Sequence, residues 1–462
     1  MDPFIETARQ FAVLRTWGNM PIARHGQGIY LFDEKGKRYI DGASGSSLVA
    51  NLGHAVAEIP RAMHEQAMRV SFAAPHVFAT EPLLSLASLV AGYAPGSMRN
   101  NCRAWFTCTG TDAVDDAMRV ARQYLVSIGK RSKTLFISRW QGFHGNNISV
   151  AGMHGHTRRR RLFSGMNINS PHIPPAFCYR CPYETTRDKC RLKCARALET
   201  EIRQQGAENV AAFVAEPVVG AALGAVPAPD GYFQEIRGIC DKYEVLMIID
   251  EVMTAWGRTG RWFAIEEWGV TPDIIATAKG LTGGYATLAA TIAREDIWSA
   301  IAETGTPFLA GHTMDLNPVA CSGALATLDY IDRNDLLANA RIQGAYLLER
   351  LRELLSYPIV GDVRGRGLMC GLELVADKAT AEPFPASLKV AKKLEQAAFE
   401  LGLVVFSCEG SLEGVAGDMI LVAPPLVVTR HQVDEIIELL KEAIERLGPL
   451  TKDTQSLNKE DG

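Results

Sequence analysis

Short apolar runs alternate with amphipathic stretches from about residue 60 to residue 325. The runs are the length of buried strands, and the stretches between them place apolar residues near the helical period. This alternation predicts a doubly wound α/β sheet with helices between its strands. The predicted strands cover residues 103–108, 134–138, 211–216, 245–249, 274–278 and 287–293.

The pattern differs at both ends of the chain. Residues 28–41 alternate in the manner of a hairpin and lead into a loop rich in glycine and serine at 42–54. Helical periodicity at 338–355, a strand pair at 363–373 and a last helix capped by Thr429 follow the sheet. We therefore expect four parts: an N-terminal segment packing with the small domain (1–60), a large domain (61–325), a small C-terminal domain (326–450) and a disordered polar tail (451–462).

Lys279 ends the apolar run at 274–278, and three glycines follow it within five residues. A lysine is seldom fully buried. Where a buried strand opens into a turn it can lose water, which lowers the pKa of its amine and makes the amine a nucleophile. The alternative is a lysine whose stem is buried while its amine reaches the surface.

Asp250 ends a second buried run, at 245–249. Ligands of open α/β sheets lie at the carboxyl ends of the strands, so Asp250 and Lys279 are expected to face one crevice. A lysine beside a buried carboxylate suits pyridoxal 5′-phosphate (PLP). The lysine can hold the aldehyde as an imine (a Schiff base), and the carboxylate can keep the ring nitrogen protonated.

Several motifs occur here in the order found in one enzyme family. They are Asp250-Glu-Val252, Trp256-Gly-Arg-Thr-Gly260, Pro272-Asp-Ile274 and Ala278-Lys-Gly280. In these motifs the chain resembles the class III aminotransferases of PLP fold type I, over nearly its whole length. The resemblance implies a large domain around a mostly parallel sheet of the seven-stranded type and a smaller α+β C-terminal domain.

The resemblance also assigns roles to individual residues. Gly110 and Thr111 start a helix, where free N–H groups suit a phosphate, although such residues also cap helices without a ligand. Phe143 would stack on the cofactor ring, and Thr313 would reach the phosphate in a neighbouring subunit, which implies a homodimer with shared sites. Lys279 and Asp250 are the implied catalytic residues. The implied cofactor-binding residues are Gly110, Thr111, Phe143, His144, Glu216, Asp250, Val252, Lys279 and Thr313.

The implied reaction is a ping-pong transamination from an amine or ω-amino acid to an oxo acid such as pyruvate. An aminomutase, epimerase or decarboxylase could use the same cofactor and fold. Relatives that act on ω-amino acids often read Gly-Val-Arg-Gly-Asp where this chain has Gly414-Val-Ala416-Gly-Asp418. Without that arginine a distal carboxylate lacks a charged partner, which favours donors without a distal acid.

Cys178, Cys181, Cys190 and Cys194 follow a C-x2-C-x8-C-x3-C spacing, which looks like a tetrahedral zinc site. The gap of eight is shorter than in most zinc modules, and the resembled family needs no metal. We expect free thiols and no metal, with a zinc-dependent binding module as the alternative.

Composition narrows the function classes. The 462 residues are 47% apolar and carry a net charge of −4, which argues against a general nucleic-acid role. The arginine run 158–161 is then expected to be a solvated face, or to attract anionic substrate at a site entrance. We see neither a signal peptide nor a membrane-spanning run, and ten cysteines without an export signal suggest reduced thiols, so we expect a cytoplasmic protein.

Overall fold

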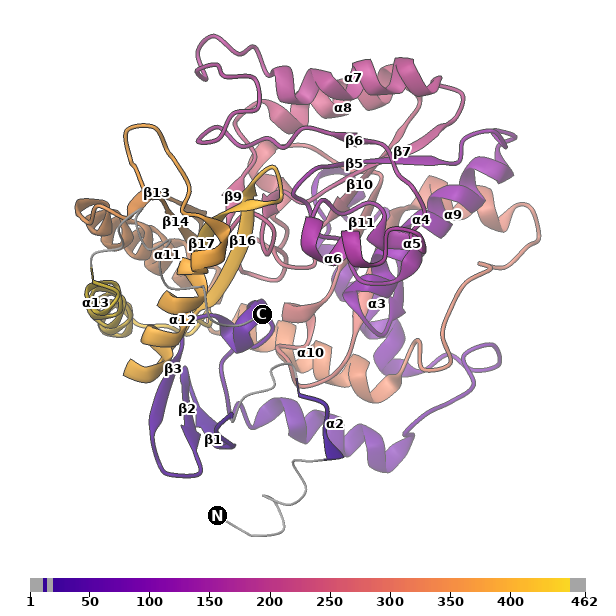
Figure 1. Ribbon diagram of the computed structural model, residues 1–462. Coiled ribbons are helices and arrows are strands. Elements are labelled where there is room, and N and C mark those ends of the chain that lie inside the picture. The colour runs from indigo at the N-terminus through magenta and orange to yellow at the C-terminus, as the bar shows by residue number, and fades with distance from the viewer. Residues whose placement is uncertain (1–10, 15–19, 449–462) are drawn as a thin grey trace.

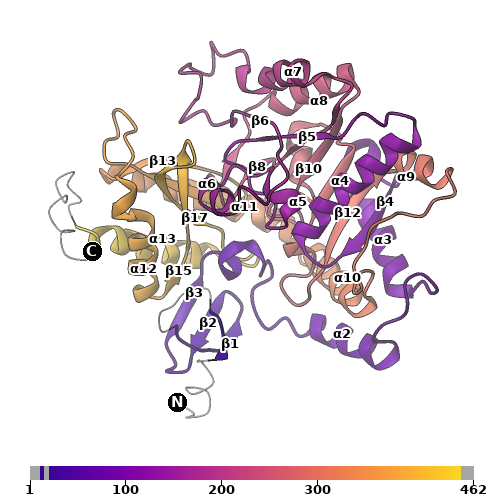
Figure 2. The ribbon, with the colours of Figure 1, turned by 45° about the vertical axis from the view of Figure 1, so that its right-hand side comes forward.

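The computed structural model describes residues 11–14 and 20–448 (Figures 1 and 2). The tail predicted at 451–462 lies outside the described residues, as do residues 1–10 of the predicted N-terminal segment. The domain boundaries stay a prediction, because the fold shows which elements pack together but not where independent units begin.

A seven-stranded sheet forms the centre of the molecule, in the order β4-β12-β11-β10-β7-β5-β6. Only β12 runs antiparallel to its neighbours, so the sheet is mostly parallel, as predicted. Every residue of β7, β10 and β11 is buried, because helices cover both faces of the sheet. The strands are β4 (Cys102–Thr107), β5 (Leu135–Arg139), β6 (His172–Ile173), β7 (Val210–Ala215), β10 (Leu246–Asp250), β11 (Ile274–Thr277) and β12 (Ala289–Arg294).

Helices pack on the two faces of this sheet. The helices α7 and α8 contact each other and lie on the opposite side of the sheet from α4 in Figures 1 and 2. The helices α2, α3 and α10 form a separate packed group. Their bounds are α2 (Glu58–Arg69), α3 (Glu81–Tyr93), α4 (Gly110–Ser127), α5 (Ile148–Ala151), α6 (Thr157–Leu162), α7 (Lys193–Gln205), α8 (Tyr232–Tyr243), α9 (Glu295–Ala302) and α10 (Pro318–Arg333).

The C-terminal part is built on a four-stranded antiparallel sheet, in the order β13-β14-β17-β16. The N-terminal strands β1, β2 and β3 join it indirectly, because β3 pairs with β15. The elements are β1 (Ala23–Gln27), β2 (Tyr30–Asp33), β3 (Arg38–Asp41), α11 (Leu336–Glu353), β13 (Val360–Arg366), β14 (Met369–Leu374), α12 (Val390–Leu401), β15 (Leu403–Val404), β16 (Phe406–Leu412), β17 (Ala416–Val422) and α13 (Arg430–Arg446). A small hairpin, β8 (Val218–Val219) and β9 (Val226–Pro227), lies between β7 and α8.

Local sequence signals fix several helix starts. Thr109 accepts a hydrogen bond from the N–H of Asp112, and the Asp112 side chain accepts one from Thr109 N–H, so a capping box starts α4. Thr429 caps α13, as the sequence predicted, and forms the same kind of box with Gln432. Asn317 caps α10, whose first residue is Pro318.

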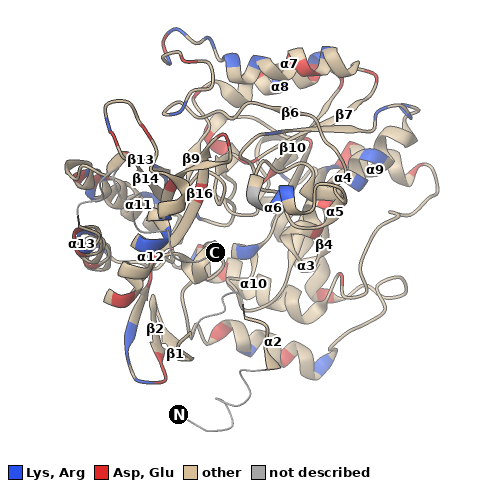
Figure 3. Cartoon of the chain, viewed as in Figure 1, with Lys and Arg blue, Asp and Glu red and all other residues tan. Residues whose placement is uncertain are grey.

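Charges of both signs are interspersed over the outer helices (Figure 3). Such mixing suits a chain whose net charge is small. Within residues 11–14 and 20–448, no helix is both long and apolar enough to cross a bilayer.

Candidate active site

Lys279 and Asp250 lie at the same edge of the sheet. Strands β10 and β11 are parallel neighbours, and Asp250 is paired with Ala276, three residues before Lys279. The chain therefore leaves both strands at their carboxyl ends, where binding sites of α/β folds form. The sequence predicted this juxtaposition.

Asp250 is buried, and each of its oxygens has a polar partner. Its Oδ2 lies 2.8 Å from Nδ1 of His144, and its Oδ1 accepts a hydrogen bond from the N–H of Val252 at 3.0 Å. His144 is buried as well, with an exposed fraction of 3%. The imidazole and the backbone amide hold the carboxylate in one orientation.

Lys279 sits in a strained turn. Its φ is +47°, a left-handed conformation that is uncommon for a residue other than glycine. Burial lowers the pKa of its amine from 10.5 to about 8, while the negative charges of Asp250 and Glu216 oppose the shift. The amine is thus far closer to neutral form at physiological pH than an ordinary lysine is.

Glu216 follows β7, the other neighbour of β10. Its two oxygens accept hydrogen bonds from the N–H groups of Phe143 at 3.0 Å and Gly220 at 3.1 Å. Burial raises the pKa of Glu216, and the charge of His144 counteracts this. Glu216 therefore fixes the loop that carries the half-buried Phe143 ring.

The start of α4 approaches the same place. A Cβ added to Gly110 would lie 2.7 Å from Cγ1 of Val252, so only glycine fits there without a shift. A Cβ on Gly145 would lie 2.7 Å from the Thr111 side chain. The N–H groups of Gly110 and Thr111 are in the first turn of α4 and have no partner within the helix. A phosphate fits such a helix start.

Thr313 differs from the other predicted site residues in its exposure. Its side chain is exposed, on the segment between α9 and α10. The neighbouring His312 points back to α4, with its Nε2 3.7 Å from Oδ1 of Asp112. The segment that carries Thr313 therefore lies against the start of α4, with the Thr313 side chain exposed.

Two residues near the site received no role from the sequence. Arg258 belongs to the quoted Trp256-Gly-Arg-Thr-Gly260 motif, and Asn51 lies in the 42–54 loop. The structure joins them by a hydrogen bond at 2.6 Å, next to the turn after Lys279. The glycine motif marked the position of Arg258, but nothing in the sequence pointed to its partner 207 residues away.

The four loop cysteines surround one small cavity of about 30 Å³, together with residues such as Tyr183 and Arg187. Across the described part of the chain, no group of three or more His, Cys, Asp or Glu side chains is arranged to hold a metal ion. The loop is attached to the C-terminal sheet, because Arg180 Nε donates to Glu373 at 2.6 Å. Whether the four thiols bind zinc stays a prediction to be tested by metal analysis of the purified protein.

The arginine run lies on α6 and is only partly a solvated face. The guanidinium carbon of Arg159 is 5.2 Å from the centre of the Phe143 ring, and that of Arg160 is 4.4 Å from the Trp140 ring. These are cation–π distances. Part of the run therefore packs on aromatic residues of the site loop.

The arrangement defines a class of enzyme. A lysine and an aspartate at the carboxyl ends of adjacent parallel strands, with a helix start and an aromatic ring beside them, are the features of PLP enzymes of fold type I. The buried carboxylate suits a protonated ring nitrogen, and the start of α4 suits a phosphate.

Comparison with known proteins agrees with this class. Residues 15–444 match the family described as aminotransferase class-III. An uncharacterised aminotransferase of Bacillus subtilis, YodT, is 34% identical over 92% of this chain and 95% of its own length. The chain therefore belongs to the class III aminotransferases, whose cofactor is PLP.

Two solved structures are similar over nearly the whole chain. One is an (S)-enantioselective omega-transaminase from Thermomicrobium roseum, with a TM-score of 0.89 and 33% identity over 96% of this chain and 99% of that one. The other is an amine transaminase from an uncultivated Pseudomonas species in its PLP-bound form, with a TM-score of 0.87 and 32% identity over 95% of this chain and 100% of that one. Both confirm the predicted fold.

Proposed function

We propose that this aminotransferase moves the amino group of an amine or ω-amino acid to an oxo acid such as pyruvate, in two half-reactions of a ping-pong cycle. The observation that carries the proposal is the Lys279 amine, with its lowered pKa, beside the Asp250–His144 pair. The likeness to an omega-transaminase supports an amine donor.

Each residue of the site has a proposed task. When bound, PLP carries the amino group between the two substrates and withdraws electrons from the reacting carbon. Lys279 anchors the cofactor and, as a base with a pKa of about 8, takes and returns a proton at the substrate carbon. Asp250 stabilises positive charge on the ring nitrogen, and His144 keeps the carboxylate in place.

The other residues orient the cofactor. Gly110 and Thr111 hold its phosphate at the start of α4, and Val252 packs beside them. Phe143 stacks on the ring, while Glu216 fixes the backbone of Phe143 and faces the substrate side.

We further propose that the preferred donor lacks a distal carboxylate. Ala416 begins β17, and the neighbouring Gly414 packs on Thr157 at the start of α6. No guanidinium can come from position 416. Ala416→Arg should raise kcat/KM for an ω-amino acid relative to the amine of the same chain length, because a bidentate ion pair then becomes available. Wild-type protein that already favours the ω-amino acid by a wide margin would contradict this proposal.

We also propose a homodimer. Large apolar side chains are exposed in two loops on the same side of the molecule (Figures 1 and 2), including Phe72, Val77, Phe78, Leu309 and Met314. Clusters of this kind mark protein interfaces. The loop that carries Leu309 and Met314 also contains Thr313. A second copy of the chain that covers these side chains would therefore have Thr313 of the first copy near its own site.

The function is tested with purified protein, PLP, pyruvate and a panel of amines and ω-amino acids. We expect alanine to form in equal amounts with the aldehyde, ketone or oxo acid derived from the donor. Lys279→Ala is the control and should form neither. Release of CO₂, or an isomerised amino acid without alanine, would instead favour a decarboxylase, aminomutase or epimerase.

A further inference from the structure

Arg258 is a buried cation without an acidic partner. Its side chain is fully buried, and within the described residues no aspartate or glutamate forms an ion pair with it. Burial lowers its pKa to about 9, although the charge of Asp41 opposes the shift. A charge in such a position is costly unless polar groups surround it. Its neutral acceptors must therefore be held firmly in place.

These acceptors come from two other parts of the chain. Nη1 of Arg258 donates to the carbonyl oxygens of Leu368 at 3.0 Å and Pro424 at 2.5 Å. Nη2 donates to Oγ of Ser44 at 2.9 Å and Oδ1 of Asn51 at 2.6 Å. One guanidinium thus joins the segment after β10, the 42–54 loop and the C-terminal part.

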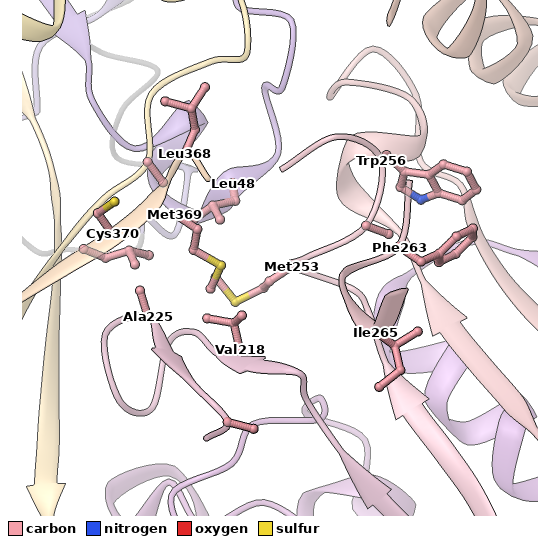
Figure 4. Packing of buried hydrophobic residues seen from close by; sticks show 14 of the residues in the cluster. Leu48, Val218, Ala225, Met253, Trp256, Phe263, Ile265, Leu368, Met369 and Cys370 are labelled. Carbon is pink, nitrogen blue, oxygen red and sulfur yellow. The ribbon is translucent and has the colours of Figure 1, made fainter. Parts of the chain in front are cut away.

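Apolar side chains of the same three parts also pack together. Figure 4 shows them close together, among them Leu48 of the loop, Met253 after β10 and Met369 of β14. Arg258, Ser44 and Asn51 are each at most 1% exposed, so their polar contacts are shielded from water, which strengthens them.

The 42–54 loop needs such support because its backbone is strained. Ser44, Ser46 and Leu48 have φ values of +46°, +73° and +61°, in the left-handed region that favours glycine. Such conformations persist only where surrounding structure imposes them, and they cluster at functional sites. Asp41 contributes by accepting the N–H of Gly45, and Arg258 fixes the loop at Ser44 and Asn51.

Asn51 connects the loop held by Arg258 to the turn that contains Lys279. Its Oδ1 accepts from Arg258, and its Nδ2 donates to the carbonyl oxygen of Trp256 at 3.1 Å, so the amide is held at both ends. A Cβ added to Gly280 would lie 2.1 Å from that Nδ2. The amide is thus packed directly against the residue that follows Lys279.

We propose that Arg258 is a positioning residue for Lys279, acting through Asn51 to hold the turn at Gly280 and to keep water from the lysine amine. The inference rests on the proposed role of Lys279. The carboxylates that act on the amine, Asp250 and Glu216, do not contact Arg258 and stay unchanged in the variants below.

The test compares Asn51→Ala and Arg258→Lys with the matched control Gln66→Ala in the full chain loaded with PLP. Gln66 of α2 is also a buried side-chain amide, 8% exposed, and its Nε2 donates a hydrogen bond to Val70 O at 2.9 Å, at the end of its own helix. The first readout is hydrogen exchange of the peptide spanning 279–285. We expect about tenfold faster exchange in Asn51→Ala, since a buried turn loses a supporting contact, and no change in the control.

The second readout is the pH dependence of kcat. On the acidic side of the pH profile, kcat falls as Lys279 becomes protonated. This fall should occur at higher pH in Asn51→Ala and Arg258→Lys, because a hydrated lysine has a pKa nearer its ordinary 10.5. We call this part of the profile the acidic limb. The limb should stay in place in Gln66→Ala, although all three variants lower Tm. If Arg258→Lys does not fold, Asn51→Ala decides alone.

Unchanged exchange and an unchanged limb in Asn51→Ala, with the same fall in Tm as the control, would show a purely structural role and overturn the proposal. Hydrogen exchange does not depend on turnover. A chain that performs another PLP reaction would therefore contradict the proposed function while leaving this comparison intact.

Discussion

At the scale of single residues, the proposed reaction depends on the removal of the Lys279 and Asp250 side chains from water. We expect Lys279→Ala to lower the rate of transamination by at least about 10²–10⁴-fold, the contribution of a positioned proton-transfer group. Borohydride treatment of the PLP-loaded protein, followed by peptide mass spectrometry, should modify Lys279. Modification of a different lysine would show that the cofactor is anchored elsewhere.

Asp250→Asn separates charge from geometry. Asparagine has the size of aspartate and can still contact His144 and the Val252 N–H, so the fold should be kept. Loss of the negative charge should lower kcat by at least about 10²-fold, because the ring nitrogen is no longer stabilised as a cation. The measurements are kcat and the circular dichroism spectrum. Near-normal kcat would mean that another acid contacts the ring.

At the scale of elements, the start of α4 must come close to the segment after β10. Gly110→Ala places a Cβ 2.7 Å from Val252, and overpacking of this kind costs about 1–3 kcal/mol. We expect a raised Kd for PLP, measured by titrating the cofactor-free protein and following its absorbance.

Gly238→Ala in α8 is the matched control for Gly110→Ala. A Cβ there meets no atom within 4 Å, and alanine favours a helix by up to about 1 kcal/mol over glycine. Its Kd for PLP should equal that of the wild type, with an equal or higher Tm. The same loss of PLP affinity in both variants would contradict a specific role for the α4 start.

At the scale of the whole molecule, we propose that each site is formed by two chains, because Thr313 is exposed and the resemblance places it at the phosphate of a neighbouring subunit. A Lys279→Ala subunit and a Thr313→Ala subunit should each be weakly active or inactive. Hybrid dimers should regain one working site, formed by Lys279 of one subunit and Thr313 of the other. Hybrids without regained activity, with their formation shown by mass spectrometry, would place Thr313 in the site of its own subunit.

The sequence by itself determined six of the seven strands of the central sheet and the residues at their carboxyl ends, but it missed the short strand β6. The mostly parallel arrangement was implied by the resemblance to class III aminotransferases. Buried strands read as continuous apolar runs, and the residue after each run is visible in the sequence, so Asp250, Glu216 and Lys279 were found in this way. The capping residues of α4 and α13 could also be recognised from the sequence around them.

Only the tertiary structure decided which side chains meet. The contact of His144 with Asp250 joins residues 106 positions apart, and that of Asn51 with Arg258 joins residues 207 apart. Such pairs depend on the crossing of several connections and on the exact turn of each loop, which no local pattern encodes. The same holds for the pKa of Lys279, because the charges that act on the amine, those of Asp250 and Glu216, lie at the ends of other strands of the sheet.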